Sequence, residues 1–145
     1  MEKARLAAEA GAELVINYRE QDAAAAIRAW APDGVERIVE VALGANAALD
    51  AEVMAPDGEI LSYGAPDRPF DVPRALMVKN GSVRFVLVYT MPQAAKRQAV
   101  EDITEALGRG ALSALPALRF PLERIDAAHE AVREHAVGKV LVEIP

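Results

Sequence analysis

The sequence of 145 residues contains no cysteine, which excludes disulfide bonds, thiolate catalysis and cysteine zinc sites within this chain. It has no run of 18 apolar residues, so no membrane-spanning helix is expected. Its first residues, Met-Glu-Lys-Ala-Arg, lack the apolar core of a signal peptide. From these absences we expect a cytoplasmic protein without a membrane partner.

Clustered positive charge is missing as well. The formal net charge is −6, which argues against duplex nucleic acid as a partner, because phosphate binding requires clustered Lys and Arg. The hydrophobic share of 52% and the charged share of 26% are typical of a folded soluble domain. The length suits one domain, and the sequence shows no repeat, low-complexity segment or obvious linker. We therefore predict a single domain over residues 1–145.

Helical and strand patterns alternate along the chain, with turn signals between them. The predicted helices cover about residues 2–10, 21–30, 46–54, 74–79, 92–108 and 124–134. The predicted strands cover residues 13–18, 37–42, 59–64, 82–90 and 139–144, and an extended piece covers residues 116–121. Short apolar strands separated by helices are typical of a parallel sheet that is buried on both faces. The pattern therefore predicts an α/β fold with a doubly wound, Rossmann-like sheet.

Four local patterns carry a resemblance when they are taken in order. They are Lys3 with Glu-Ala-Gly-Ala and Val-Ile-Asn-Tyr-Arg, Arg-Ile-Val-Glu-Val-Ala with Asn46, Arg-Phe-Val-Leu-Val-Tyr-Thr, and Ala-His-Glu-Ala with Gly-Lys-Val-Leu-Val. Together they resemble the zinc-independent quinone oxidoreductases related to zeta-crystallin, within the medium-chain dehydrogenase/reductase superfamily. The resemblance runs from the first residue to the last.

This resemblance implies an enzyme that transfers hydride from NADPH to a quinone or a similar enone. In the family, a lysine and a tyrosine contact the adenosine 2′-phosphate, and their positions fall on Lys3 and Tyr18. The chemistry is consistent, because a dianionic phosphate suits an ammonium and a hydroxyl donor, whereas an NAD site uses a carboxylate on the ribose diol. The structural alternatives are a solvated helix lysine and a strand-end aromatic ring that reaches water.

The resemblance implies further cofactor contacts at the carboxyl edge of the sheet, where open α/β sheets bind ligands. Asn46 and Gly64 follow two successive strands, and their structural alternatives are a helix N-cap and an ordinary glycine turn. Phe85, Val86 and Leu87 resemble the segment whose backbone meets the nicotinamide carboxamide, and they also fit a buried strand. Lys139 corresponds to a basic residue that faces the pyrophosphate; its alternative is a surface lysine.

No residue is a convincing catalytic acid or base. Glu40 lies inside an apolar strand, where relatives keep a structural residue. His129 and His135 are six positions apart, whereas a spacing of four would place two metal ligands on one helix face. We therefore predict neither a catalytic residue nor a metal site in this chain.

The family pattern also includes parts that this sequence does not contain. The Gly-rich turn that holds the pyrophosphate would precede Lys3, and the domain that forms most of the quinone pocket is absent. We therefore expect a partial cofactor-binding domain that is inactive alone. In the family strand order 3-2-1-4-5-6, residues 13–18 correspond to strand 3 and residues 37–42 to strand 4. Without strands 2 and 1 between them, the two segments would lie about 10 Å apart. Direct pairing of these two strands or exchange with a second copy is our hypothesis; detachment is the alternative.

The predicted strand at residues 82–90 should form the outer edge of the sheet, where a bare apolar strand promotes association. Relatives bury this region in a two-fold dimer, so we predict a homodimer through residues 82–90. Two other functions stay open. One is a zinc-containing alcohol dehydrogenase whose zinc ligands lie in the missing domain, and the other is a non-enzymatic module that binds nucleotide or self-associates.

Overall fold

The computed structural model describes residues 2–65, 69 and 71–145. The chain divides into two compact units. The first unit comprises Met1–Val15 and Val100–Pro145, and the second comprises Ile16–Ala99. None of the helices in the described part of the chain is long and apolar enough to cross a membrane.

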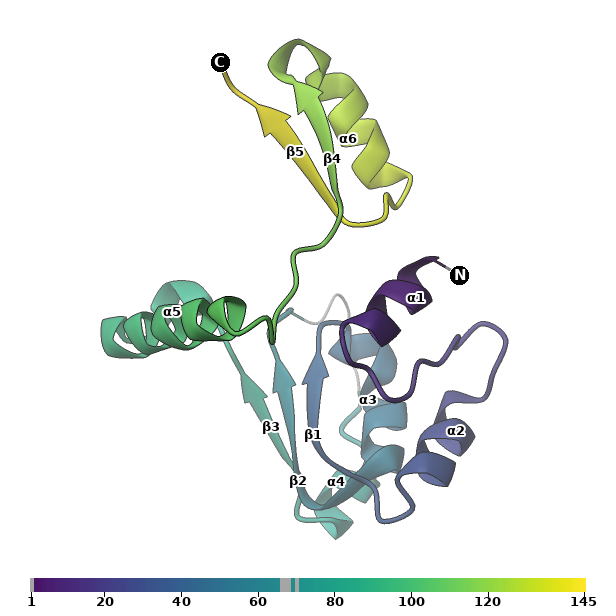
Figure 1. Cartoon of the computed structure of the whole chain (residues 1–145). Helices are drawn as coiled ribbons and strands as arrows, with labels where there is room; N and C mark the ends of the chain where they lie inside the picture. The colour runs from purple at the N-terminus through teal and green to yellow at the C-terminus, as the bar shows by residue number, and fades with distance from the viewer. Residues whose placement is uncertain (1, 66–68, 70) are drawn as a thin grey trace. The chain divides into compact units, whose positions relative to one another are not determined.

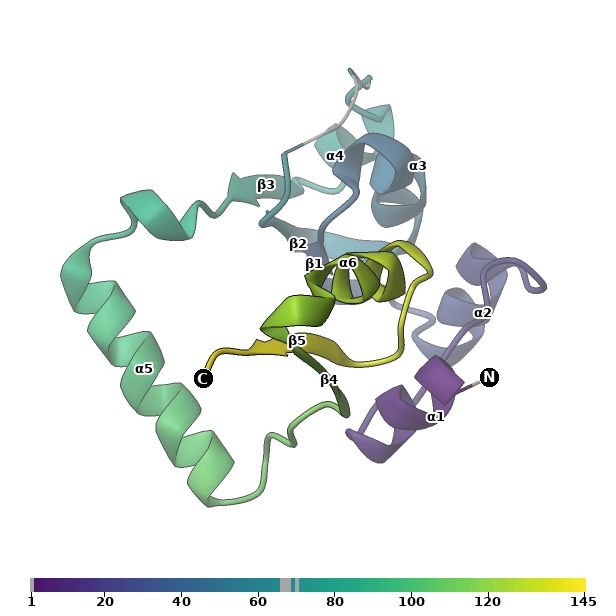
Figure 2. The same ribbon diagram turned by 90° about the horizontal axis from the view of Figure 1, so that it is seen from above.

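The second unit contains a three-stranded parallel sheet in the order β1-β2-β3. Its strands are β1 (Val35–Glu40), β2 (Met54–Ser62) and β3 (Ser82–Phe85), and its helices are α2 (Ala23–Trp30), α3 (Leu43–Val53) and α4 (Arg74–Val78). Helix α3 packs against β1 and β2, and α2 and α4 pack against α3 (Figures 1 and 2). In the register of the sheet, Glu40 lies opposite Ser62, and Ser62 lies opposite Phe85. The three strands therefore end level with one another at one edge of the sheet.

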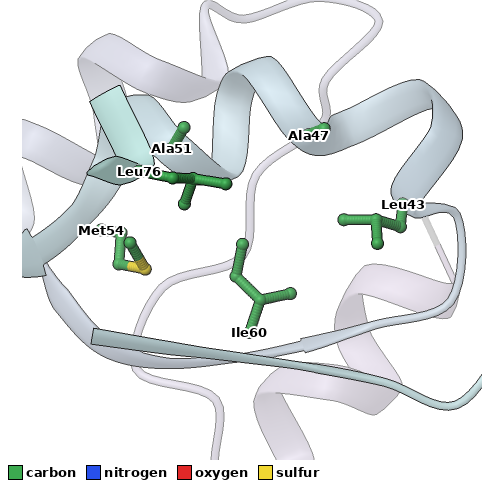
Figure 3. Packing of buried hydrophobic residues seen from close by; sticks show 6 residues of the cluster. All are labelled: Leu43, Ala47, Ala51, Met54, Ile60 and Leu76. Carbon is green, nitrogen blue, oxygen red and sulfur yellow. The ribbon is translucent and has the colours of Figure 1, made fainter. Parts of the chain in front are cut away.

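The core of the second unit lies between α3 and the sheet. It is formed by Leu43, Ala47, Ala51, Met54, Ile60 and Leu76 (Figure 3). Three of these residues recur every four positions along α3, so they share one helix face. Ile60 is 0% exposed and points from β2 toward α3. This packing fixes α3 on the sheet and, with it, the turn that joins β1 to α3.

The first unit contains α1 (Glu2–Glu9) and a smaller parallel pair, β4 (Ala117–Pro121) and β5 (Lys139–Glu143). A 3-10 turn, η2 (Leu122–Arg124), leads into α6 (Ile125–Arg133), which packs on both strands (Figure 2). The long helix α5 (Gln93–Gly108) extends from residues of the second unit into residues of the first. Gly138 precedes β5 with a φ of 93°, a conformation that favours glycine.

The predicted α/β class with parallel strands is confirmed. Every predicted helix is present, with ends displaced by up to about three residues, as hydrogen-bond assignment of fraying helix ends allows. Helix α1 ends at Glu9, one residue before the predicted end, and Gly11 follows with a φ of 101°. The predicted turn at residues 56–58 lies inside β2 as an irregularity, because Val35 pairs with Met54 while Arg37 pairs with Glu59.

The predicted strand at residues 82–90 is too long. Strand β3 ends at Phe85, and a 3-10 helix, η1 (Val88–Thr90), follows it. β2 ends at Ser62, so beyond Phe85 the chain has lost its ladder partner and turns. The predicted position of this strand at an edge of the sheet is confirmed for β3.

The predicted strand at residues 13–18 is wrong. In the described part of the chain these residues belong to no strand, and β1 has β2 as its ladder partner. Residue Asn17 forms local bonds instead: its carbonyl accepts from the N–H groups of Glu20 and Gln21. A strand is stabilised by ladder bonds, and no described strand pairs with this segment. Direct pairing with β1 is therefore also wrong, while exchange with a second copy stays a prediction.

Candidate functional site

Backbone hydrogen bonds extend the sheet by one residue at its carboxyl edge. The N–H of Tyr63 donates to the Glu40 carbonyl at 3.1 Å, and the N–H of Val86 donates to the Ser62 carbonyl at 2.9 Å. We define the strand-end site as the residues that follow the three strands: 41–42, 63–64 and 86–87. Because the strands are parallel and in register, these three short segments lie side by side.

Gly64 lies where two of these segments meet. A Cβ atom at this position would lie 2.5 Å from the Val41 carbonyl oxygen, so a side chain would force the backbone apart. The Ser62 hydroxyl, buried beneath the edge, donates to the Gly64 carbonyl at 3.0 Å. Gly64 does not have a positive φ. Its requirement is therefore close backbone approach rather than an unusual turn conformation.

Glu40 ends β1 with a side chain that is only 6% exposed. Its Oε1 accepts hydrogen bonds from the backbone N–H of Val41 at 2.7 Å and from that of Ala42. Its Oε2 accepts from Asn46 Nδ2 at 3.0 Å. The carboxylate thus holds the turn between β1 and α3 from inside.

Asn46 is not the N-cap that the sequence suggested. It lies inside α3, whose N-cap residue is Ala42. Its side chain reaches back to Glu40 rather than to a free N–H of the first helical turn. Because α3 begins at Leu43, Asn46 lies past the N-cap position, and its Nδ2 donates to the buried acid at the end of the preceding strand.

Asp50 lies four residues after Asn46, on the same face of α3. It is 5% exposed, and its Oδ2 has no hydrogen-bond partner among the described residues. Burial, the charge of Glu40 and a hydrogen bond to the Glu40 side chain, in decreasing order of effect, together raise the pKa of Asp50 from 3.8 to about 7. The sequence analysis missed Asp50. The available signal was an acid on the otherwise apolar face formed by Leu43, Ala47 and Ala51.

Phe85, Val86 and Leu87 do not form a buried strand, which corrects that part of the prediction. Phe85 is 60% exposed, Leu87 is also exposed, and Val86 is half-buried. Phe85 ends β3, which is an edge strand, and Val86 and Leu87 follow it. The segment therefore offers exposed apolar surface and backbone at the strand-end site.

The structure of the second unit gathers Asn46, Gly64 and residues 85–87 at one edge. Tyr18 belongs to the same unit, is 73% exposed, and has the Arg19 guanidinium 5.9 Å from its ring centre. Lys3, on α1, and Lys139, at the start of β5, belong to the first unit and are exposed. Their predicted cofactor contacts remain predictions.

A protein-family model described as zinc-binding dehydrogenase matches residues 10–142. The chain belongs to the zinc-binding dehydrogenase family. A quinone oxidoreductase of Lama guanicoe is 25% identical over 142 residues, which cover 95% of this chain and 43% of that protein. The zinc-binding dehydrogenase chain thus spans about two fifths of the length of the curated relatives it matches.

Solved structures show the same fold. A quinone oxidoreductase of Pseudomonas syringae matches with a TM-score of 0.79 and 19% identity, over 99% of this chain and 46% of that one. An alcohol dehydrogenase zinc-binding domain protein of Burkholderia ambifaria matches with a TM-score of 0.80 and 21% identity, over 98% of this chain and 39% of that one. The predicted resemblance to quinone oxidoreductases of the medium-chain dehydrogenase/reductase superfamily is confirmed, and with it membership of an oxidoreductase family.

The family description raises the question of zinc. The sequence has no cysteine, and its two histidines are His129 in α6 and His135 just after that helix. Among residues 2–65, 69 and 71–145, no group of three or more His, Asp or Glu side chains is placed to hold a metal ion. The described residues therefore do not fit a zinc site, since such sites need three or four converging ligands.

Proposed function

We propose that the strand-end site is the nicotinamide-binding edge of an NADPH-dependent oxidoreductase that transfers hydride to a quinone or a similar enone. One observation carries the proposal. In a chain of a dehydrogenase family, three parallel strands end in register, and Gly64 brings two of their loops into close backbone contact. The carboxyl edge of such a sheet is where α/β proteins bind nucleotides.

The cofactor supplies the hydride chemistry, and this chain's residues bind and orient it. The absence of a side chain at Gly64 lets the loop after β2 pack against the Val41 carbonyl, which brings two backbone segments of the edge together. Residues 85–87 offer backbone groups and apolar side chains beside it, which suits a flat aromatic ring with a carboxamide. The Glu40 carboxylate points inward and is engaged in hydrogen bonds, so we assign it no proton transfer.

The choice of NADPH over NADH rests on Lys3 and Tyr18. Both side chains are exposed, and the guanidinium of Arg19 lies over the Tyr18 ring. Cationic and hydroxyl donors together suit the dianionic 2′-phosphate of NADPH. Lys139, also exposed, is proposed to face the pyrophosphate.

The test is a titration of the 145-residue chain with NADPH and with NADH, followed through Trp30, the single tryptophan, or through cofactor emission. We expect tighter binding of NADPH, and we expect Lys3→Ala to weaken NADPH binding about tenfold, or roughly 1.4 kcal/mol, while NADH binding stays unchanged. Arg5→Ala is the matched control, because it removes a positive charge from the same helix. Equal affinity for the two nucleotides would overturn the NADPH assignment.

Failure to bind either nucleotide would favour the non-enzymatic module or an inactive fragment of the oxidoreductase. The zinc-containing alcohol dehydrogenase is supported by the family description, and it requires zinc ligands outside this chain. Zinc analysis of a longer protein that contains this chain tests it directly.

We also propose a homodimer through residues 82–90. This segment lies at an edge of the sheet and exposes Phe85, Leu87, Val88 and Tyr89. Exposed apolar side chains on an edge strand favour pairing with another chain. Sedimentation at micromolar concentration checks the dimer, and Phe85→Lys should convert it to a monomer; a monomeric wild-type chain would contradict the proposal.

A further inference from the structure

We propose that Glu40 and Asp50 form a proton-sharing carboxyl pair that positions the β1–α3 turn, and that loss of the shared proton loosens this turn at the strand-end site. The effect of this pair on cofactor binding rests on the function proposed above, whereas the pair itself and its effect on the turn do not. Neither residue is proposed to touch the cofactor; both are positioning residues.

The hydrogen bonds of Glu40 define what the pair holds. Oε1 accepts from the backbone N–H groups of Val41 and Ala42, the two residues between β1 and α3. Oε2 accepts from Asn46, in the first turn of that helix. One carboxylate therefore joins the strand end, the turn and the helix start. These bonds need Glu40 to be an acceptor, and they are strongest when it is ionised.

Asp50 supplies the second half of the pair. Both side chains are at least nine-tenths buried, and they are hydrogen-bonded to each other. Two ionised carboxylates have no proton to donate, so this bond requires a proton on one of them. Since Glu40 serves as the acceptor for Val41, Ala42 and Asn46, the proton belongs on Asp50. Desolvation of Asp50, followed by the charge of Glu40, acts in the same direction, because both raise its pKa.

The other charged groups around α3 are engaged elsewhere. From α2, Arg28 pairs with Glu52, which lies on the outer side of α3. Lys79, after α4, donates from Nζ to the backbone carbonyls of residues 51, 52 and 54. On β2, Glu59 pairs with arginines of the neighbouring strands. The charge that acts on Asp50 is therefore that of Glu40, carried by β1.

Movement of this turn would reach the strand-end site directly. The Val41 carbonyl packs against Gly64 so closely that no Cβ fits between them. When Asp50 ionises, the bond between the two carboxyl groups is lost and two like charges face each other in a buried place. The turn is then held less firmly, and so is the surface against which Gly64 rests.

Amide hydrogen exchange tests the pair without any nucleotide. After correction for the intrinsic rate, we expect protection of the amides of Val41 and Ala42 to fall about tenfold between pH 6 and pH 8, as release of one proton with a pKa near 7 requires. In Asp50→Asn, which keeps a donor for Glu40, protection should not change with pH. In Asp50→Ala, which removes the donor, protection should be low at both pH values. Asp71→Asn, at an exposed position of the same unit, is the matched control and should behave as wild type.

The proposal is overturned if wild-type protection does not depend on pH, or if Asp50→Asn keeps the wild-type dependence. NADPH titration at pH 6 and pH 8 then separates this proposal from the proposed function. An affinity that weakens with pH in the wild type but not in Asp50→Asn supports both. The expected exchange pattern together with no binding of either nucleotide supports the carboxyl pair and refutes the cofactor edge.

Discussion

Raising the pH from 5 to 8 should destabilise the second unit through Asp50. The pKa of this carboxyl is 3.8 in its unperturbed state and about 7 in the folded chain. Between these values the folded state retains a proton that the unfolded state has released. The stabilising contribution is therefore fully present below pH 3.8 and is lost as the pH rises toward 7, because stability falls wherever the folded state binds more protons.

The magnitude follows from the same two values. Each pH unit inside this window changes the free energy of unfolding by about 1.4 kcal/mol for one proton. Asp50 stops contributing to the pH dependence above about pH 7, where it is ionised in the folded state as well. From pH 5 to pH 8 the free energy of unfolding therefore falls by about 2–3 kcal/mol. Local relaxation around the buried pair makes this an upper limit. That is a large share of the roughly 5–15 kcal/mol that stabilises a typical domain. Asp50→Asn removes the titration and should abolish the loss.

Urea unfolding at pH 5, 6, 7 and 8, followed by Trp30 fluorescence, measures this effect. Trp30 lies in the second unit and is the single tryptophan, so its signal reports the unit that contains Asp50. The difference in unfolding free energy between wild type and Asp50→Asn at each pH isolates the contribution of Asp50 from those of the other titratable groups. Asp71→Asn controls for the loss of a carboxylate. If the two stability curves run parallel from pH 5 to 8, Asp50 does not carry the shared proton and the reasoning fails.

Three substitutions test packing and capping. Gly64→Ala should destabilise the second unit by about 1–3 kcal/mol, because the new Cβ would lie 2.5 Å from the Val41 carbonyl oxygen. Urea unfolding measures this loss, and an unchanged unfolding midpoint would contradict the close approach. Lys79→Met should cost about 1–3 kcal/mol in the same assay, because three carbonyls at the end of α3 lose a charged donor, and Lys96→Met is its control. Gly138→Ala should lower the melting temperature of the first unit, because the φ of this residue is 93° and a Cβ would lie 2.1 Å from the Pro116 carbonyl oxygen. Circular dichroism follows the melting, and a wild-type melting temperature would refute this strain.

The helices and the parallel class were predictable from the sequence because their signals are local. Helix α2 begins with an Asp22 side chain that accepts from Ala25 N–H, and it is followed by a turn at Gly34 whose φ is 88°. Helix α5 follows Pro92, whose fixed φ suits the start of a helix. Such features depend on residues a few positions apart, which a sequence displays directly.

The errors concern features that depend on distant partners. Residues 13–18 have the composition of a strand, but a strand forms only where a ladder partner is present. Asn46 is a residue type that is common at N-caps, but its side-chain Nδ2 donates to the Glu40 carboxylate. Asp50 gives no sign of its role in a linear pattern, because its proximity to Glu40 arises only when α3 packs on β1. Long-range packing and burial decided all three outcomes.

The two halves of a cofactor site have different requirements in this chain. The nicotinamide edge needs the register of β1, β2 and β3 and the packing of α3, and both are internal to the second unit. The proposed phosphate contacts involve Lys3 and Lys139, which belong to the first unit and not to the sheet of the second. β1 also keeps one unpaired edge, with Val39 69% exposed, where the family order continues with further strands. The proposed orientation of the nicotinamide and the proposed binding of the phosphates therefore depend on different units, and substitutions at Gly64 and at Lys3 should affect them independently.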